Sequence, residues 1–172
     1  RTALSRAAAV AERESALVTV GVVPTRPDTG FGYIRPGSPV GDGVFRVDRF
    51  IEKPDRASAE RMINEGALWN SGIFAWRVGD FLDDVRALTP ELAPALASAN
   101  GNAARFFQLA TPVTVDVGVL ERSSNVVVMP GSFQWDDVGT WAALARVRAR
   151  DERGNAASGS AVLVDANDNV VY

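Results

Sequence analysis

Four short segments of the chain hold the side chains that could do chemistry. In chain order they are residues 24–34 (PTRPDTGFGYI), 52–54 (EKP), 68–74 (LWNSGIF) and 135–141 (WDDVGTW). They offer hydroxyl groups, a lysine ammonium, a side-chain amide and two neighbouring carboxylates. Hydroxyls and amides both donate and accept hydrogen bonds, and lysine is a compact positive charge that suits a phosphate. These segments are therefore the candidates for binding a polar, negatively charged molecule.

The first segment is a loop that ends in closely spaced glycines. Gly32 has no side chain, so a ligand can approach its backbone closely, and Thr29 adds a hydroxyl group nearby. The alternative is that Gly30 and Gly32 only shape a tight turn. The residues of this loop leave both interpretations open.

The second segment joins an acceptor for hydroxyl groups, Glu52, to a cation for a phosphate, Lys53. Because a residue before proline is biased toward extended backbone, Pro54 predicts an extended Lys53. The side chains of Glu52 and Lys53 would then point in opposite directions. The alternative is an ordinary charged pair at the end of a strand.

The third and fourth segments supply an amide and a pair of aspartates. Asn70 can donate and accept, as recognition of a sugar requires, although Asn and Gly also serve backbone turns; Trp69 beside it is expected to pack. If the fourth segment is extended, Asp136 and Asp137 face opposite ways. Because carboxylates are ligands that Mg²⁺ prefers, the pair offers one candidate metal ligand and one structural residue.

The order and spacing of these segments resemble the sugar-1-phosphate nucleotidyltransferases, and their wording is closest to the mannose-1-phosphate guanylyltransferases, from about residue 15 onward. The resemblance implies that the loop glycine and threonine lie against the sugar, that the lysine contacts the sugar phosphate and the glutamate the sugar, and that the asparagine lies near the 2-hydroxyl. The implied substrate-binding residues are Thr29, Gly32, Glu52, Lys53, Asn70, Gly72 and Asp116. The implied catalytic residues are Lys53 and Asp137, with Asp137 as a Mg²⁺ ligand. At Asp116 the chain departs from the family, because Val117 stands where an aromatic residue is usual.

The reaction of the family is attack of a sugar-phosphate oxygen on the α-phosphorus of GTP, which forms GDP-mannose and releases pyrophosphate. Members hold the triphosphate with an N-terminal glycine-rich loop, and a further aspartate gives the other metal ligand; these 172 residues show neither. We therefore expect the chain to be part of a longer enzyme and inactive alone. The alternatives are a nucleotidyltransferase for glucose 1-phosphate or another hexose phosphate, or a non-catalytic regulatory subunit.

Composition also limits the binding partners, the metal sites and the cellular location that we expect for the protein. The net charge of −3 gives no basic field for nucleic acid or anionic lipid. With neither Cys nor His, these residues form no disulfide and no thiolate or imidazole metal site, which leaves carboxylates for a hard cation such as Mg²⁺. No run reaches the roughly 20 apolar residues of a membrane span, and the start lacks a signal-peptide pattern. We expect a cytoplasmic protein that binds no nucleic acid and no membrane; a homodimer is an open expectation.

Helical and strand patterns alternate along the chain, which predicts an α/β layered, Rossmann-like sheet of the GT-A kind, flanked by helices and incomplete at the N-terminus. The expected helices span 2–16, 55–65 (capped by Asp55 or Ser58), 81–88, 91–99, 102–109 and 141–150 (capped by Thr140); the expected strands span 17–23, 44–51, 73–78, 113–119, 124–129, 161–164 and 170–172, with turns at 24–32 and 36–43. We expect residues 1–150 to form the sugar-phosphate-binding half of the catalytic domain and 151–172 to begin a β-rich extension.

Overall fold

The computed structural model describes residues 2–171, which divide after Ser132 into two compact units. In chain order, unit 1 contains α1 (Thr2–Glu14), β1 (Leu17–Val22), β2 (Tyr33–Gly41), β3 (Val44–Ile51), α2 (Arg56–Asn64), β4 (Leu68–Ala75), α3 (Val78–Leu88), α4 (Ala93–Ala99), α5 (Ala103–Leu109), the π-helix η1 (Asp116–Leu120) and β5 (Val126–Gly131). Unit 2 contains α6 (Trp141–Val147), β6 (Ala156–Ala157) and β7 (Val170–Val171). The compact units divide at a different place from the predicted functional boundary at residue 150, and that assignment stays a prediction.

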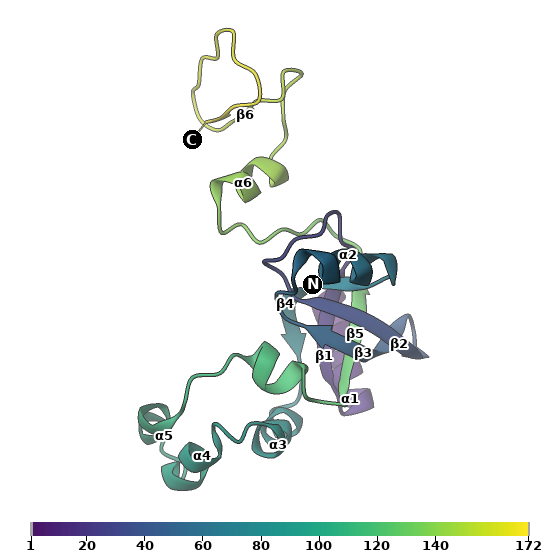
Figure 1. Ribbon diagram of the computed structural model, residues 1–172, viewed down its shortest axis with the longest axis vertical. Coiled ribbons are helices and arrows are strands. Elements are labelled where there is room, and N and C mark those ends of the chain that lie inside the picture. The colour runs from purple at the N-terminus through teal and green to yellow at the C-terminus, as the bar shows by residue number, and fades with distance from the viewer. Residues whose placement is uncertain (1, 172) are drawn as a thin grey trace. The chain divides into compact units, whose positions relative to one another are not determined.

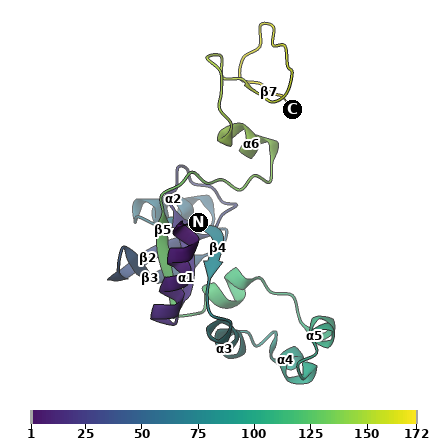
Figure 2. The same cartoon turned by 180° about the vertical axis from the view of Figure 1, so that it is seen from behind.

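The strands of unit 1 close on one another in the order β1-β4-β2-β3-β5. The pair β1–β5 is parallel and the other pairs are antiparallel. Helices α1 and α2 lie against the strands, and α3, α4, α5 and η1 lie toward one end of them (Figures 1 and 2). The predicted α/β class, with a sheet flanked by helices, is confirmed.

Alternation along β1 sends side chains into two apolar clusters. Val18 and Val20 pack with Val10 of α1, whereas Leu17 faces the second cluster, which includes Leu120 of η1. Thr19 shares the second face and is fully buried, so it is a polar side chain inside a strand that is otherwise apolar or glycine. The two clusters fix the strand that carries this threonine.

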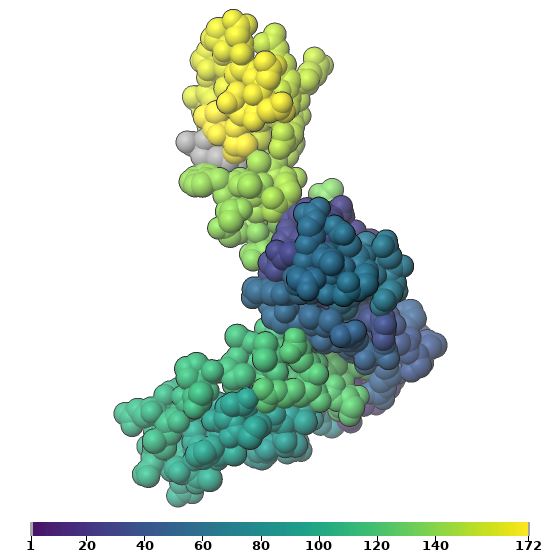
Figure 3. All heavy atoms as spheres, in the orientation of Figure 1, coloured from purple at the N-terminus to yellow at the C-terminus, as the bar shows by residue number. Residues whose placement is uncertain are grey.

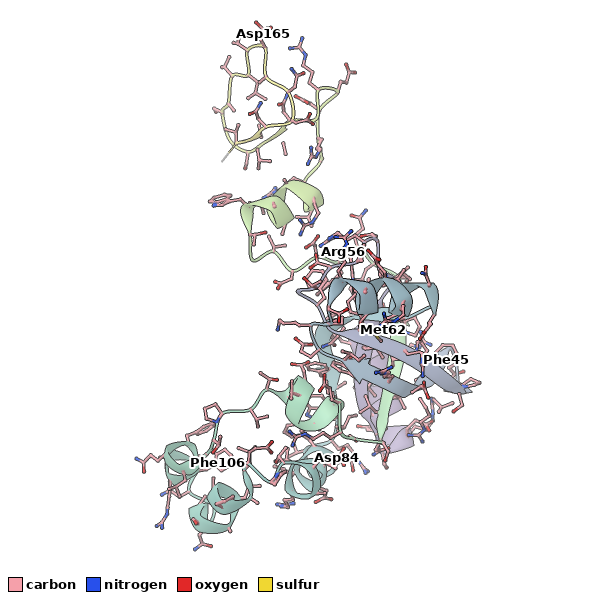
Figure 4. All side chains as sticks on the ribbon, in the orientation of Figure 1. Phe45, Arg56, Met62, Asp84, Phe106 and Asp165 are labelled. Atoms are coloured by element: carbon pink, nitrogen blue, oxygen red, sulfur yellow. The ribbon has the colours of Figure 1, made fainter. Side chains whose placement is uncertain are left out.

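Helix α2 begins as its sequence predicts. The Asp55 side chain accepts a hydrogen bond from the Ser58 backbone N–H at 2.7 Å, which satisfies one of the unpaired amides of the first turn. Met62, labelled in Figure 4, is 4% exposed on the face of α2 that packs inward. Thr140 caps α6 in the same way, through the Ala143 amide.

The predicted turn at 36–43 is wrong, because β2 continues to Gly41 and only Asp42 and Gly43 turn the chain. Both have positive φ, as a two-residue hairpin loop requires. β2 pairs with β4 only at Tyr33 and Ile34. The prolines of β2 come after these residues, where the edge of β2 that faces β4 forms no strand pairing. The register with β3 shifts at these prolines, which accommodates their missing N–H groups.

Three other predictions of strands need correction. β4 begins at Leu68, five residues earlier than expected. The stretch 113–119 is not a strand: its end forms η1, in which the neighbours Val119 and Leu120 pack into the same apolar cluster, whereas neighbours in a strand point to opposite faces. Residues 161–164 form no strand either, and Val162 there is 90% exposed. The remaining predicted helices and strands are confirmed within a few residues across 2–171. Tyr172, the last residue of the predicted strand 170–172, lies outside the described residues.

The helical end of unit 1 and the whole of unit 2 differ from the sheet in their packing. Helices α3–α5 form a lobe, drawn in teal to green in Figure 3, with Phe106 on α5 (Figure 4). Unit 2 has a polar centre at Asn155, which is 3% exposed. Across residues 2–171, no helix has both the length and the apolar character needed to cross a bilayer.

Candidate functional site

The LWNSGIF segment forms a bulge in β4. Between the pairs Thr19–Phe74 and Gly21–Asn70, three residues of β4 lie opposite the single residue Val20. Ser71 Oγ donates to the Val20 carbonyl at 2.6 Å and accepts from the Ile73 amide at 3.2 Å. Gly72 takes φ +71°, which glycine adopts without steric cost. The Asn-Ser-Gly spacing therefore specifies a bulge, and bulges redirect the neighbouring side chains.

The Asn70 side chain lies at the centre of a hydrogen-bonded cluster. Its Oδ1 accepts from the Thr19 hydroxyl at 3.0 Å and from the Gly72 amide at 3.2 Å, and its Nδ2 donates to Asp116 Oδ1 at 2.9 Å. A backbone N–H can only donate, so the Gly72 contact fixes which end of the carboxamide is the oxygen. Asn70 and Asp116, both predicted site residues, are thus in direct contact.

Gly32 lies directly against this cluster. Its backbone carbonyl accepts a hydrogen bond from the backbone N–H of Asn70 at 2.8 Å. A Cβ added to Gly32 would lie 2.5 Å from Glu52 Oε2 and 3.2 Å from the Asn70 Cβ. Gly32 is therefore required for the close approach of two other predicted residues, and it does more than shape a turn.

Lys53 is not extended, contrary to the prediction. Its φ is +48°, and its amide donates to the Phe31 carbonyl at 3.2 Å, which holds a bend before Pro54. This tertiary hydrogen bond outweighs the local bias from proline. The side chains therefore meet instead of diverging: Lys53 Nζ lies 2.8 Å from Glu52 Oε1, with 63% of the lysine side chain exposed.

Glu121, which the sequence did not single out, connects the end of η1 to this bend. Its Oε1 accepts from the Glu52 amide at 2.7 Å. The π-helix that carries Asp116 is thus tied to the Glu52–Lys53 segment as well as to Asn70. Thr19 and Glu121 were missed because a threonine within a β-branched strand and a glutamate after a predicted strand carry no distinctive local signal.

Thr29 lies outside the hydrogen-bonded cluster. It is exposed in the turn that follows Asp28, whose Oδ1 accepts from the Gly30 amide at 3.0 Å. Asp28 also pairs with Arg26, whose guanidinium lies 5.0 Å from the centre of the Trp69 ring. Trp69 is buried at 1% exposure, so it packs, as expected.

The candidate metal ligand belongs to unit 2. Asp137 is exposed, in a segment without helix or strand. Its neighbour Asp136 has a side chain that is only 5% exposed and accepts two hydrogen bonds from Arg146 of α6, at 2.7 and 2.9 Å. Asp136 is thus occupied in a structural ion pair. Asp137 presents the hard oxygen donors that Mg²⁺ prefers, and no group of three or more metal-binding side chains gathers within residues 2–171.

Two cavities lie elsewhere, in the lobe of α3–α5. They measure about 540 and 450 Å³ and share Leu92 and Phe106 in their linings. Neither lining contains a predicted site residue. The candidate site is therefore the hydrogen-bonded cluster at the barrel, formed by Thr19, Gly32, Glu52, Lys53, Asn70, Gly72, Asp116 and Glu121.

Comparison with known proteins identifies the class. Residues 1–154 match the model of the nucleotidyl transferase family, and the chain belongs to this family.

Individual relatives within the family show what the chain is most usefully compared with. The chain is 36% identical to the xanthan biosynthesis protein XanB of Xanthomonas campestris, covering 100% of the chain and 38% of that protein. It is 34% identical to the mannose-1-phosphate guanylyltransferase RfbM of Salmonella typhimurium, covering 91% of the chain and 35% of that protein. The chain thus spans little more than a third of the length of these relatives.

A solved structure shares the fold. The crystal structure described as mannose-1-phosphate geranyltransferase from Thermus thermophilus matches with a TM-score of 0.82 at 34% identity, over 99% of this chain and 53% of that one. This match confirms the predicted nucleotidyltransferase fold.

Proposed function

We propose that the protein containing this chain is a mannose-1-phosphate guanylyltransferase, which makes GDP-mannose and pyrophosphate from GTP and mannose 1-phosphate. The observation that carries the proposal is the contact of Asn70 with Asp116 beside Gly32 and Glu52. Residues far apart in the chain meet there and offer hydrogen-bonding groups of both kinds. The names of the relatives supply the choice of substrate.

The cluster has the chemistry to hold a hexose phosphate. One N–H of the Asn70 carboxamide is engaged by Asp116, and the second is suited to a sugar hydroxyl. Glu52 offers carboxylate oxygen to further hydroxyls. Gly32 leaves the space in which the sugar approaches the backbone.

Lys53 is the residue that would bind the phosphate. Its contact with Glu52 is an ion pair with an exposed lysine, and such pairs contribute little stability. A phosphate dianion can therefore compete for the ammonium at small cost. In the reaction, Lys53 would hold the sugar phosphate. A phosphate oxygen of the sugar phosphate bonds to the α-phosphorus of GTP, and the bond between the α-phosphorus and pyrophosphate breaks. The role of Lys53 is positioning and charge stabilisation.

Asp137 would supply one of the carboxylates that hold Mg²⁺. The ion, when bound, neutralises charge on the nucleotide phosphates. The engagement of Asp136 by Arg146 leaves Asp137 as the carboxylate of the pair that fits this role.

The test is pyrophosphate release by the whole protein. GTP with mannose 1-phosphate should give turnover that exceeds that of UTP or dTTP with glucose 1-phosphate. Lys53→Met should raise the KM for mannose 1-phosphate by about tenfold or more, because a charge-assisted contact is lost. Equal or better turnover with glucose 1-phosphate would refute the proposed substrate.

A further inference from the structure

Thr19 belongs to the hydrogen-bonded cluster, although the sequence did not predict it as a site residue. Its side chain is fully buried on β1, and its hydroxyl donates to Asn70 Oδ1 at 3.0 Å. The other residues of its strand are leucine, valine and glycine. A buried hydroxyl in such surroundings is stable only when it is hydrogen-bonded, and here its acceptor is the amide at the centre of the cluster.

The bulge of β4 exists at the point where this contact forms. It lies between Asn70 and Phe74, opposite Val20, and Ser71 closes it on the Val20 carbonyl. The Asn70 oxygen thereby receives two donors from the protein, one from Thr19 and one from the Gly72 backbone. Both donors act on the oxygen, so the nitrogen is turned to Asp116.

We infer that Thr19 is a positioning residue for sugar recognition: its buried hydroxyl anchors the Asn70 carboxamide in the orientation that the Gly72 N–H and Asp116 set, with the second N–H available to a sugar hydroxyl. The inference rests on the proposed function. Without the hydroxyl, the amide oxygen keeps one donor, the backbone N–H of Gly72. The carboxamide keeps its orientation, because the Gly72 backbone N–H can only donate and the Asp116 carboxylate accepts. With one hydrogen bond fewer it is held less firmly, so its second N–H is less well placed for a sugar hydroxyl.

The first experiment is steady-state kinetics on the whole protein with Thr19→Val, which keeps the shape and removes the hydroxyl. The KM for mannose 1-phosphate should rise about tenfold, the loss expected for one buried hydrogen bond, while the KM for GTP changes less than about twofold. Thr19→Ser restores the hydroxyl and should recover most of the affinity. Equal impairment in the two variants, or an unchanged KM for the sugar phosphate in Thr19→Val, would overturn the role.

Thr89→Val provides the matched control. Thr89 is also fully buried, and its hydroxyl donates to the Val85 carbonyl of α3 and not to Asn70. It therefore reports the general cost of losing a buried threonine hydroxyl. Thermal unfolding of both valine variants should show similar losses, with the rise in KM confined to Thr19→Val. A similar rise in both would mean that Thr19 acts through stability alone.

A second readout does not depend on turnover. In whole protein labelled with ¹⁵N-asparagine, the side-chain NH₂ signals of Asn70 can be assigned with Asn70→Asp. They should shift in Thr19→Val and return in Thr19→Ser, and Thr89→Val should leave them in place. Signals that do not respond to Thr19→Val would refute the inference. Absence of turnover with mannose 1-phosphate in the unchanged protein would instead refute the proposed substrate, while these signals still test Thr19.

Discussion

The two units of the chain achieve order by different means. Unit 1 has two apolar clusters, one on each face of β1, and its polar cluster forms at the edge of one of them. Unit 2 has two-residue strands and a buried amide, Asn155, whose side chain bonds to Asp151, Ala166 and Asn169. Apolar packing thus organises the first unit, and hydrogen bonds around one side chain organise much of the second.

This difference matters for the candidate residues. Asn70 and Asp116 are joined by a direct hydrogen bond, and Gly32 and Glu52 lie within contact distance of one another. Asp137 lies in an exposed segment of unit 2 that has no regular structure. The groups proposed for the sugar are therefore pre-organised by contacts within their own unit. The proposed metal ligand lies in an irregular segment, next to Asp136, which Arg146 holds.

The largest effect is expected at Asp137. In the whole protein, Asp137→Asn should lower kcat by about 100-fold or more, because removal of one charge-stabilising group costs on that order, and the KM for mannose 1-phosphate should change little. Pyrophosphate release at a series of Mg²⁺ concentrations is the measurement.

Asp136→Asn is the matched control for that change. It removes the same charge one residue earlier, but it weakens the pair with Arg146. We expect it to lower stability more than it lowers kcat. If Asp136→Asn abolished turnover while Asp137→Asn did not, the roles of the two aspartates would be reversed.

The next effect tests the polar centre of unit 2. Asn155→Ala should destabilise this unit by about 2 kcal/mol, because the Asn169 amide and the Ala166 carbonyl lose their buried partner. Hydrogen exchange should accelerate across residues 133–171 and stay unchanged in unit 1. Asn167→Ala, at an exposed position, is the control. Loss of protection in both units at once would show that their stabilities are coupled.

A smaller effect is expected at Gly32. Gly32→Ala places a Cβ 2.5 Å from Glu52 Oε2 and 3.2 Å from the Asn70 Cβ, so both side chains must shift. The KM for mannose 1-phosphate should rise about tenfold, in the range that overpacking costs. Gly30→Ala, whose Cβ would meet only Asp28 Oδ1 at 3.2 Å, is the control. Equal KM values for the two variants would contradict a role for Gly32 in the site.

Local signals predicted much of this arrangement. The caps at Asp55 and Thr140 and the buried strand 17–22 follow from side-chain chemistry and composition, and all are present. The candidate residues came from a resemblance, and the structure brings Gly32, Glu52, Asn70 and Asp116 together. Their proximity required the fold, because pairs such as Asn70 and Asp116 are 46 residues apart.

The incorrect sequence predictions have a common physical origin. Lys53 departs from extended backbone because its amide bonds to Phe31, and 113–119 departs from a strand because Val119 and Leu120 pack into the same apolar cluster. Each is a tertiary contact that overrides a local preference. Thr19 was overlooked because threonine is ordinary in a β-branched strand, and its partner Asn70 lies on another strand.

The smallest predicted effect concerns Glu91, which pairs with Arg122 just after η1. Hydrogen bonds from the Arg122 guanidinium, at 2.7 and 3.0 Å, lower the pKa of Glu91 from 4.5 to about 2. Since the folded-state pKa is depressed, the pair stabilises fully above pH 4.5, and its contribution is lost as the pH falls toward 2. Glu91→Gln should therefore lower Tm slightly at neutral pH and flatten the fall of Tm across this acidic range. Glu60→Gln, which removes an exposed charge on α2, corrects for net charge; an unchanged acid slope in Glu91→Gln after that correction would show that the Arg122 pair does not hold the η1 end of unit 1.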